Sequence, residues 1–248
     1  MTTHNNFLHS GDLGDVLYAL PSIRAAGGGN LYLTHSRTSR ELLTKPRFDS
    51  IAPLLRVQSY LKSVEWHIGQ PITHNSELFR IHGFRREYTW GKSLVDMFAD
   101  TFNLTPDANA PWLTVPSGIK FSKPHVVFSR SPRYHNPLFP WGEIFHFYQD
   151  NAIFVGLQSE WQEFAAEFGD VPWHQTADLL ELAKVIAGCS LFVGNQSCPY
   201  AIAEGLKANT IQETWPTDPN CVFRRPNAQY VAGRRVVLKP LDELETHA

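Results

Sequence analysis

Residues 7–34 constrain the fold more than any other part of the chain. Residues 7–9 form a short apolar run that leads into a loop with two glycines. Apolar residues then recur at helical spacing over residues 15–26, and three consecutive glycines stop this helix before a second apolar run at 30–34. A strand, a helix and a second strand joined in this order form a βαβ unit, which implies a parallel sheet.

The same alternation starts again in the second half of the chain. The further predicted strands are 125–128, 152–156, 190–194 and 210–211, and the further predicted helices are 93–102, 141–148, 160–168 and 197–206, with another capped by Thr176 and ended by Gly188. Between the two series, residues 105–118 are polar and contain prolines, which favours exposed, irregular chain. The sequence therefore predicts an α/β protein with two domains, residues 1–115 and 116–248, and a cleft between them.

Composition narrows the class of protein. The 248 residues are 43% hydrophobic and 19% charged, enough apolar material for one large or two small domains. A formal net charge of −2 gives no strong field to attract nucleic acid or an anionic membrane. The three cysteines lack CxxC spacing, which argues against a disulfide framework or a zinc cluster. No window approaches the roughly 20 apolar residues of a membrane span, so a cytoplasmic protein without an integral membrane segment is expected.

The first glycine loop contains two acidic residues, Asp12 and Asp15. Ligands of open parallel sheets bind beyond the carboxyl ends of the strands, and a carboxylate at the start of the next helix is placed to accept a proton from a hydroxyl group. An aspartate that caps a helix within a glycine turn explains the same residues, and taken alone this interpretation is favoured. Because the loop is not GxGxxG, it matches the dinucleotide-binding fingerprint poorly.

A second candidate loop follows residues 190–194. Ser197 can cap the next helix, whose free N–H groups would then face a phosphate. An ordinary strand–turn–helix junction explains Gln196 and Ser197 equally well. Cys198 at the helix start is a candidate for a lowered thiol pKa, although a small residue that fits the site is the favoured interpretation.

Charged residues follow two more of the predicted strands. Arg130 and Arg133 suit a pyrophosphate, whose oxygens accept forked donors, and a solvated loop is the evenly weighted alternative. Glu160 can hold ribose hydroxyls, with Glu163 one helical turn later as a competing candidate. A glutamate favoured by the helix dipole is the other interpretation of Glu160.

These segments together resemble the family 9 glycosyltransferases, whose best-known members are the ADP-heptose:lipopolysaccharide heptosyltransferases. Residues 14–17 (GDVL) and 19–21 (ALP) are similar to the N-terminal motif of that family. Residues 176–194 are similar to the helix and strand before its phosphate loop, and 195–206 (NQSCPYAIAEGL) stand in place of the loop and its following helix. The similarity covers roughly the first 30 residues and 155–215.

The resemblance implies a GT-B fold, in which two Rossmann-like domains face each other across a cleft, with the acceptor side in 1–115 and a nucleotide-sugar donor in 116–248. It also implies inverting transfer without a metal ion or another cofactor. Asp15, rather than Asp12, would be the general base, and Arg130 or Arg133 would offset the charge of the leaving group. The implied donor contacts are Gly14, Glu160, Gln196, Ser197 and Cys198.

Three positions depart from the family pattern. The loop aspartate of the family is Gln196 here, its glycine is Cys198, and the histidine after the loop is Ala201. These changes and the short chain favour, as an alternative, a non-catalytic homologue that binds a nucleotide or glycan.

Transfer to modified DNA is a second alternative, because aromatic and arginine residues suited to stacking on bases are abundant between residues 60 and 92. They are Trp66, Phe79, Arg80, Phe84, Arg85, Arg86, Tyr88 and Trp90. With a net charge of −2, a core and an acceptor pocket are the favoured interpretation of these residues. The sequence leaves the acceptor open among glycans, lipid-linked molecules and nucleic acid.

Overall fold

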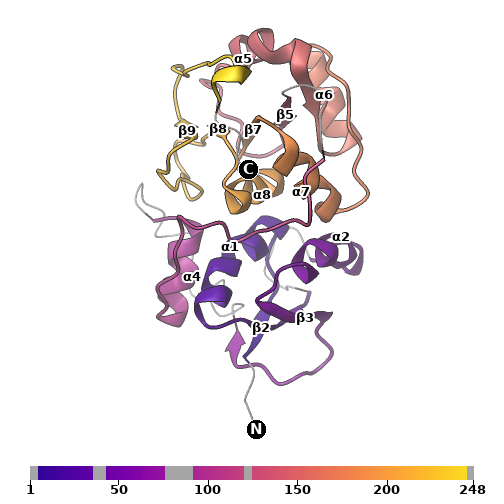
Figure 1. Ribbon diagram of the computed structural model, residues 1–248, viewed down its shortest axis with the longest axis vertical. Coiled ribbons are helices and arrows are strands. Elements are labelled where there is room, and N and C mark those ends of the chain that lie inside the picture. The colour runs from indigo at the N-terminus through magenta and orange to yellow at the C-terminus, as the bar shows by residue number, and fades with distance from the viewer. Residues whose placement is uncertain (1–4, 36–42, 76–91, 120–124, 245–248) are drawn as a thin grey trace.

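The computed structural model describes residues 5–35, 43–75, 92–119 and 125–244. Its strands form two separate parallel sheets, one from each half of the chain (Figure 1). This arrangement confirms the predicted α/β class with two successive series of strands and helices. The domain boundary at residues 115 and 116 stays a prediction.

The N-terminal half builds a sheet of strand order β3-β2-β1-β4. Its elements are β1 (Asn6–His9), α1 (Leu13–Ala25), β2 (Gly29–Leu33), α2 (Lys45–Arg56), β3 (Leu61–Trp66), β4 (His74–Asn75) and α4 (Leu94–Phe102). Residues 6–9 of β1 pair in parallel with residues 30–33 of β2, so the predicted βαβ unit is confirmed. Helix α2 was not predicted from the sequence, because Pro46 and Pro53 interrupt its pattern. Pro46 lies at the helix start, where proline is tolerated.

The C-terminal half builds a sheet of strand order β6-β5-β7-β8-β9. Its elements are β5 (Val126–Ser129), α5 (Trp141–Tyr148), η2 (Gln149–Asn151), β6 (Ala152–Phe154), α6 (Gln158–Phe168), α7 (Leu179–Gly188), β7 (Leu191–Asn195), α8 (Cys198–Leu206), β8 (Thr210–Glu213), β9 (Ala228–Val231) and η3 (Leu241–Glu243). After β9 the chain returns to α5, where the hydroxyl of Tyr148 donates to the carbonyl oxygen of Lys239 over 2.9 Å.

Two local predictions are wrong. The N-cap of α7 is Asp178, not Thr176, because the Asp178 carboxylate accepts from the backbone N–H of Glu181 over 2.9 Å. The segment between the sheets is irregular, as predicted, but Trp112 and Leu113 in it are buried. Their backbone N–H groups both donate to the carbonyl oxygen of Gly205 at the end of α8, so this stretch packs against the C-terminal half.

The second sheet is buried on both faces, because alternate residues of its strands join two different apolar clusters. Phe128 and Val193 belong to a cluster with Trp141 of α5. Val127 and Phe192, next to them in sequence, belong to the other cluster. Continuous apolar strands are typical of parallel sheets covered by helices on both sides.

Helices α7 and α8 lie between the second sheet and the N-terminal half (Figure 1). Helix α1 packs on α8, and α2 packs on α7. One apolar cluster runs from Phe7 of β1 through Leu17 of α1 to Tyr200 of α8 and Phe192 of β7. The two halves are therefore joined by a shared core as well as by the connecting chain.

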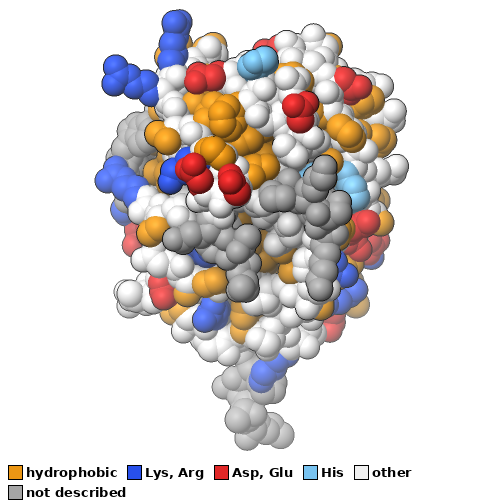
Figure 2. Space-filling model, turned by 45° about the horizontal axis from the view of Figure 1, so that its top comes forward, with side chains coloured by type: hydrophobic (Ala, Val, Ile, Leu, Met, Phe, Trp, Pro, Cys, Tyr) orange, Lys and Arg blue, Asp and Glu red, His pale blue; other side chains and the backbone are white. Residues whose placement is uncertain are grey.

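The surface carries side chains of both charge signs. Lys and Arg side chains lie close to Asp and Glu side chains at several places on the face in Figure 2, and hydrophobic side chains gather in its upper part. This mixture agrees with the small formal net charge of −2. Within the described residues, no helix combines the length and the apolar character needed to cross a bilayer.

Candidate functional site

A cavity of about 650 Å³ lies between the two halves and is lined by residues of both. Its volume is in the range of small-molecule sites. The loops that follow β1, β5, β6 and β7 all contribute to its walls, because the carboxyl ends of parallel strands meet at one edge of each sheet. The contacts between α1 and α8 bring these two edges together.

Several helices begin at this cavity. Residues in the first turns of α1, α2, α6, α7 and α8 line it. The N-terminus of a helix carries partial positive charge and free N–H groups, so it attracts anions. An anionic ligand therefore suits the cavity.

The loop after β1 places two carboxylates at the cavity. Asp15 lies in the first turn of α1, and Asp12 precedes that helix. The Asp12 side chain makes no capping hydrogen bond and instead lies 3.5 Å from the guanidinium of Arg133. Gly14, between them, faces Cys198, and a Cβ at this position would meet the Cys198 backbone at 3.9 Å. The start of α1 therefore packs against the start of α8, at a distance that also leaves room for a Cβ at position 14.

The two candidate arginines after β5 differ in position. Arg133 lines the cavity, and its side chain is 42% exposed. Arg130 is not a lining residue: its side chain is 8% exposed and pairs with Glu213, at 3.1 Å, and with Glu167, at 2.7 Å. Glu213 is fully buried and also accepts from the indole N–H of Trp141 over 2.7 Å. Arg130 therefore neutralises a buried carboxylate inside the C-terminal half.

The start of α8 is open to the cavity. Ser197 is the N-cap residue, but its hydroxyl donates to the Asn195 carbonyl oxygen over 3.2 Å and makes no capping bond. The first turn of α8 contains no acidic residue. No side chain caps the start of α8, so the backbone N–H of Cys198 can meet an anion there, whereas Pro199, the next residue, has no N–H.

The Gln196 side chain lines the cavity, but its amide is used by a neighbouring segment. Its Nε2 donates to the carbonyl oxygen of Asp218 over 2.8 Å and to Oδ1 of Asn220 over 3.1 Å. Its Oε1 accepts from the backbone N–H of Trp215 over 2.6 Å. Gln196 therefore holds the chain that follows β8.

Glu160 lines the cavity at the start of α6, whereas Glu163 does not line it. Oε2 of Glu160 accepts from the backbone N–H of Leu157 over 2.8 Å. The carboxylate folds back over Gly156, which has a φ of 138°, and a Cβ at that glycine would meet Oε2 at 2.6 Å. The backbone angle favours glycine here, and a Cβ would displace the Glu160 carboxylate from its bond to Leu157.

The thiol of Cys198 has a raised pKa. Burial, followed by the carboxylates of Glu160 and Asp12, raises the pKa of Cys198 to about 12. The lowered pKa considered from its place at a helix start is therefore wrong. The thiol is neutral at pH 7 and takes no part as a thiolate.

Several polar cavity residues were not predicted from the sequence as site residues, among them Tyr134, Arg47, Asn220 and Cys221. Tyr134 follows Arg133 in the same loop. Asn220 and Cys221 belong to the segment after β8, so the rule that ligands lie beyond the carboxyl ends of strands points to them. Arg47 lies on α2, which the sequence analysis did not find.

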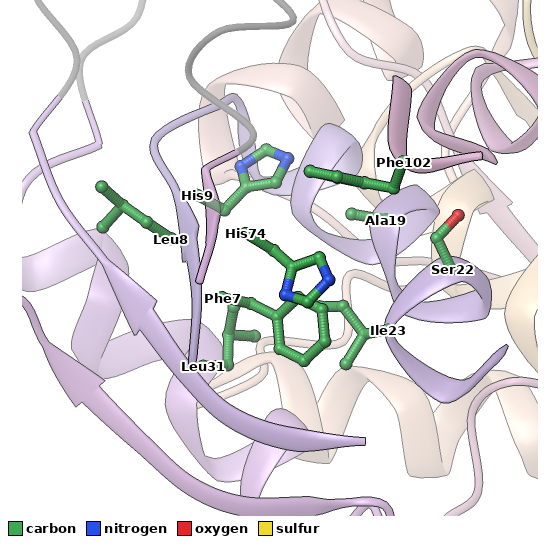
Figure 3. Close-up of a pocket in the computed structure, with 9 residues that line it drawn as sticks. All are labelled: Phe7, Leu8, His9, Ala19, Ser22, Ile23, Leu31, His74 and Phe102. Atoms are coloured by element: carbon green, nitrogen blue, oxygen red, sulfur yellow. The ribbon is translucent and has the colours of Figure 1, made fainter. Parts of the chain in front are cut away.

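A second pocket, of about 10 Å³, lies within the N-terminal half. Phe7, Ile23, His74 and Phe102 surround it (Figure 3). The rings of Phe7 and His74 stack with centroids 4.7 Å apart, and burial lowers the pKa of His74. The pocket has room for about one water molecule, so it is not a candidate ligand site.

Two further observations concern ligands. Within residues 5–35, 43–75, 92–119 and 125–244, no group of three or more His, Cys, Asp or Glu side chains is arranged to hold a metal ion. Most of the aromatic and arginine residues considered for stacking on bases lie outside the described residues: Phe79, Arg80, Phe84, Arg85, Arg86, Tyr88 and Trp90. Trp66 is described, and its ring packs edge-on against Phe48 in the N-terminal half.

No family model and no curated protein matches the sequence. Among solved structures, a family 9 glycosyl transferase from Veillonella parvula matches with a TM-score of 0.59 at 11% identity, covering 97% of this chain and 87% of that one. The E. coli heptosyltransferase WaaC, solved with ADP-2-deoxy-2-fluoro heptose, matches with a TM-score of 0.56 at 14% identity, covering 98% of this chain and 96% of its own.

The E. coli ADP-heptose lps heptosyltransferase II matches with a TM-score of 0.59 at 13% identity, covering 94% of this chain and 92% of that one. Similarity at this level of identity concerns the fold. The chain therefore has the GT-B fold of the family 9 glycosyltransferase structures, as the sequence analysis predicts.

Proposed function

We propose that this protein is an inverting glycosyltransferase that moves a sugar from a nucleotide-sugar donor to an acceptor hydroxyl, without a metal ion or another cofactor. One observation carries the proposal: a single cavity brings Asp15 of the N-terminal half together with Arg133 and the open start of α8 in the C-terminal half. A similar solved structure with an ADP-heptose analogue, that of WaaC, agrees with a donor of this class.

In the proposed reaction Asp15 takes the proton of the acceptor hydroxyl, and the oxygen forms a bond to the anomeric carbon of the donor. The bond from that carbon to the diphosphate oxygen breaks, and its electron pair leaves with the nucleoside diphosphate. Attack from the face opposite the leaving diphosphate would invert the configuration at the anomeric carbon.

Negative charge develops on the diphosphate as it leaves. The N–H groups at the start of α8 and the guanidinium of Arg133 would stabilise this charge without a metal ion. Ser197 and Cys198 would contact the phosphates, and Gly14, which faces Cys198, would lie beside them. Glu160 would accept hydrogen bonds from the ribose.

Calorimetry with ADP, UDP, GDP and CDP, and with their sugar conjugates, tests the proposal. We expect one nucleotide to bind, with competition by the matching sugar nucleotide. Absence of binding across the whole panel would overturn the proposed function.

A non-catalytic homologue that binds the same nucleotide is the second candidate function. The specific observation in its favour is that the Gln196 amide is used by residues 215–220 rather than left for a ligand. Donor turnover distinguishes the two candidates, because even slow hydrolysis to free sugar would rule out a binding protein without activity.

A further inference from the structure

Asn195 connects two loops of the cavity from a fully buried position at the end of β7. Strands β5 and β7 are neighbours, and Ser129 is paired with Gly194 at the end of their register. Asn195 is the next residue, so its side chain meets the chain just beyond β5. Parallel pairing therefore determines which loop this side chain can reach.

The side chain of Asn195 uses its donors and its acceptor on that loop. Nδ2 donates to the carbonyl oxygen of Ser131 over 2.9 Å and also to the carbonyl oxygen of Arg133. Oδ1 accepts from the backbone N–H of Ser131 over 3.1 Å. The amide thus fixes the backbone at Ser131 and Arg133, the residues on either side of Pro132.

The far end of the same loop is held separately. The backbone N–H of Asn136 donates to the buried carboxylate of Glu213 over 2.7 Å, and its side chain donates to the carbonyl oxygen of Thr214 over 2.9 Å. Between the two anchors Tyr134 has a left-handed φ of 58°, and both Arg133 and Tyr134 line the cavity. The loop is fixed at its ends and presents its middle to the ligand.

The main chain of Asn195 contacts the other part of the diphosphate site. Its carbonyl oxygen accepts from the hydroxyl of Ser197, the N-cap residue of α8. One residue therefore bonds to the loop that carries Arg133 and to the loop that starts α8. The separation of these two positive groups depends on it.

We propose that Asn195 is a positioning residue that holds Arg133 at the distance from the α8 N-terminus that a nucleoside diphosphate requires. The inference rests on the proposed function, because it assigns the diphosphate to this site. Asn195 acts through Arg133 and does not touch the ligand. A group fixed before binding loses less conformational freedom when the ligand arrives, so losing Asn195 weakens diphosphate binding even though Arg133 is still present.

A double-mutant cycle tests this role. The variants Asn195→Ala, Arg133→Ala and the double variant are compared with the wild-type protein by calorimetry, using the nucleoside diphosphate that the panel identifies. We expect Asn195→Ala to weaken binding about tenfold in the wild-type background and less than about twofold in the Arg133→Ala background. An equal loss in both backgrounds would show that Asn195 does not act through Arg133 and would overturn the inference.

Asn209 supplies a matched control. It is a buried asparagine in the same half, its Nδ2 donates to the carbonyl oxygen of Ser190 over 3.0 Å, and it does not line the cavity. Asn209→Ala should lower stability without changing nucleotide affinity. If Asn209→Ala and Asn195→Ala weaken binding equally, the effect is one of general stability, and the inference fails.

A second substitution covers the case in which Asn195→Ala does not fold. Asn195→Ser keeps a hydroxyl that can donate to the loop, whereas Asn195→Asp places a carboxylate against the carbonyl oxygens of Ser131 and Arg133. We therefore expect Asn195→Ser to bind the nucleotide more tightly than Asn195→Asp does. Equal affinity of these two variants would count against the inference. Failure of the wild-type protein to bind any nucleoside diphosphate would instead overturn the proposed function itself.

Discussion

The guanidinium of Arg133 lies 3.5 Å from the carboxylate of Asp12, and this ion pair connects the loop after β5 to the loop after β1 across the cavity. The Asp12 side chain is 17% exposed and that of Arg133 is 42% exposed, so water screens the pair only in part. A diphosphate bound at the start of α8 would compete with Asp12 for the same guanidinium.

Asp12→Asn should therefore strengthen binding of the nucleoside diphosphate. Partly exposed ion pairs contribute about 0–1 kcal/mol, which corresponds to an increase in affinity of up to about fivefold. Calorimetry in the wild-type and Arg133→Ala backgrounds measures the effect. The gain should disappear when Arg133 is absent, and a gain in both backgrounds would mean that Asp12 acts on the ligand directly.

Asp15→Asn should abolish sugar transfer and leave donor binding nearly unchanged. The amide has a similar shape but cannot take the proton of the acceptor, and loss of a general base costs about 10²–10⁴-fold in rate. Initial rates and donor affinity measured on the same preparation check this expectation. Asp12→Asn is the matched control for the transfer rate, since it removes a carboxylate from the same loop and keeps Asp15, while its donor affinity should rise as predicted above. Loss of donor binding in Asp15→Asn would give Asp15 a different role.

Arg130 and Arg133 should have opposite phenotypes. Arg130→Met leaves the buried Glu213 carboxylate without its cation, and removal of one partner from a buried pair costs about 3–5 kcal/mol of unfolding free energy. Arg133→Met should change stability little and should weaken nucleotide binding. Urea denaturation and calorimetry on both variants separate the two roles. Equal stabilities of the two variants would contradict the assignment of Arg130 as a buried structural cation.

Gln196→Asp, which introduces the family residue, should destabilise this protein. Aspartate lacks the Nε2 group that donates to Asp218 and Asn220, and it places a carboxylate among their oxygen atoms. Loss of such buried hydrogen bonds costs about 1–3 kcal/mol, measurable by chemical denaturation. Ser197→Ala is the control with a smaller expected effect, because only one hydrogen bond of 3.2 Å is lost. Unchanged stability of Gln196→Asp would show that the chain after β8 does not depend on Gln196.

Stability should fall as the pH rises above about 9, in part through the cysteines. Burial is the main cause that raises the pKa values of Cys189, Cys198 and Cys221 to about 12, from 9.0. Between these values the unfolded chain releases thiol protons that the folded chain retains, so ionisation favours unfolding. Below about pH 9 both states keep the protons, and the thiols add no pH dependence.

Urea denaturation at a series of pH values, with thiolate absorbance recorded in parallel, measures this decline. Cys198→Ala should make the alkaline slope shallower. An unchanged slope, together with thiolate absorbance that appears in the folded protein near pH 9, would contradict the raised pKa of Cys198.

The sequence predicted where the cavity loops lie, but it predicted less well which groups their side chains contact. Glycines and apolar runs near residues 14, 133, 160 and 197 place these loops at strand ends, and parallel topology brings such loops together. The partners of the side chains are distant in sequence. Arg130 does not line the cavity, because its guanidinium bonds to Glu213 instead. Glu213 lies 83 residues further along the chain, so no local sequence pattern contains this contact.

The unpredicted helix α2 and the mispredicted N-cap of α7 have physical explanations. The prolines of α2 hide its apolar stripe, although Phe48, Ile51 and Leu55 are buried on one side. For α7, Thr176 and Asp178 are both good N-cap residues, and the choice between them depends on where Leu182 enters the core. The burial of Leu182 depends on residues distant in the sequence that share its apolar cluster, so short-range sequence patterns do not determine which residue caps the helix.

The core shared by the two halves limits how this protein can be rebuilt. Leu17 and Tyr200, from opposite halves, are buried in the same apolar cluster. The C-terminal half therefore cannot be transferred alone to another acceptor-binding domain. In such a fusion the faces of α7 and α8 that α1 and α2 now cover would be exposed to solvent. A chimera with a different acceptor specificity must either retain α1 and α2 or have both sides of their interface with α7 and α8 redesigned together.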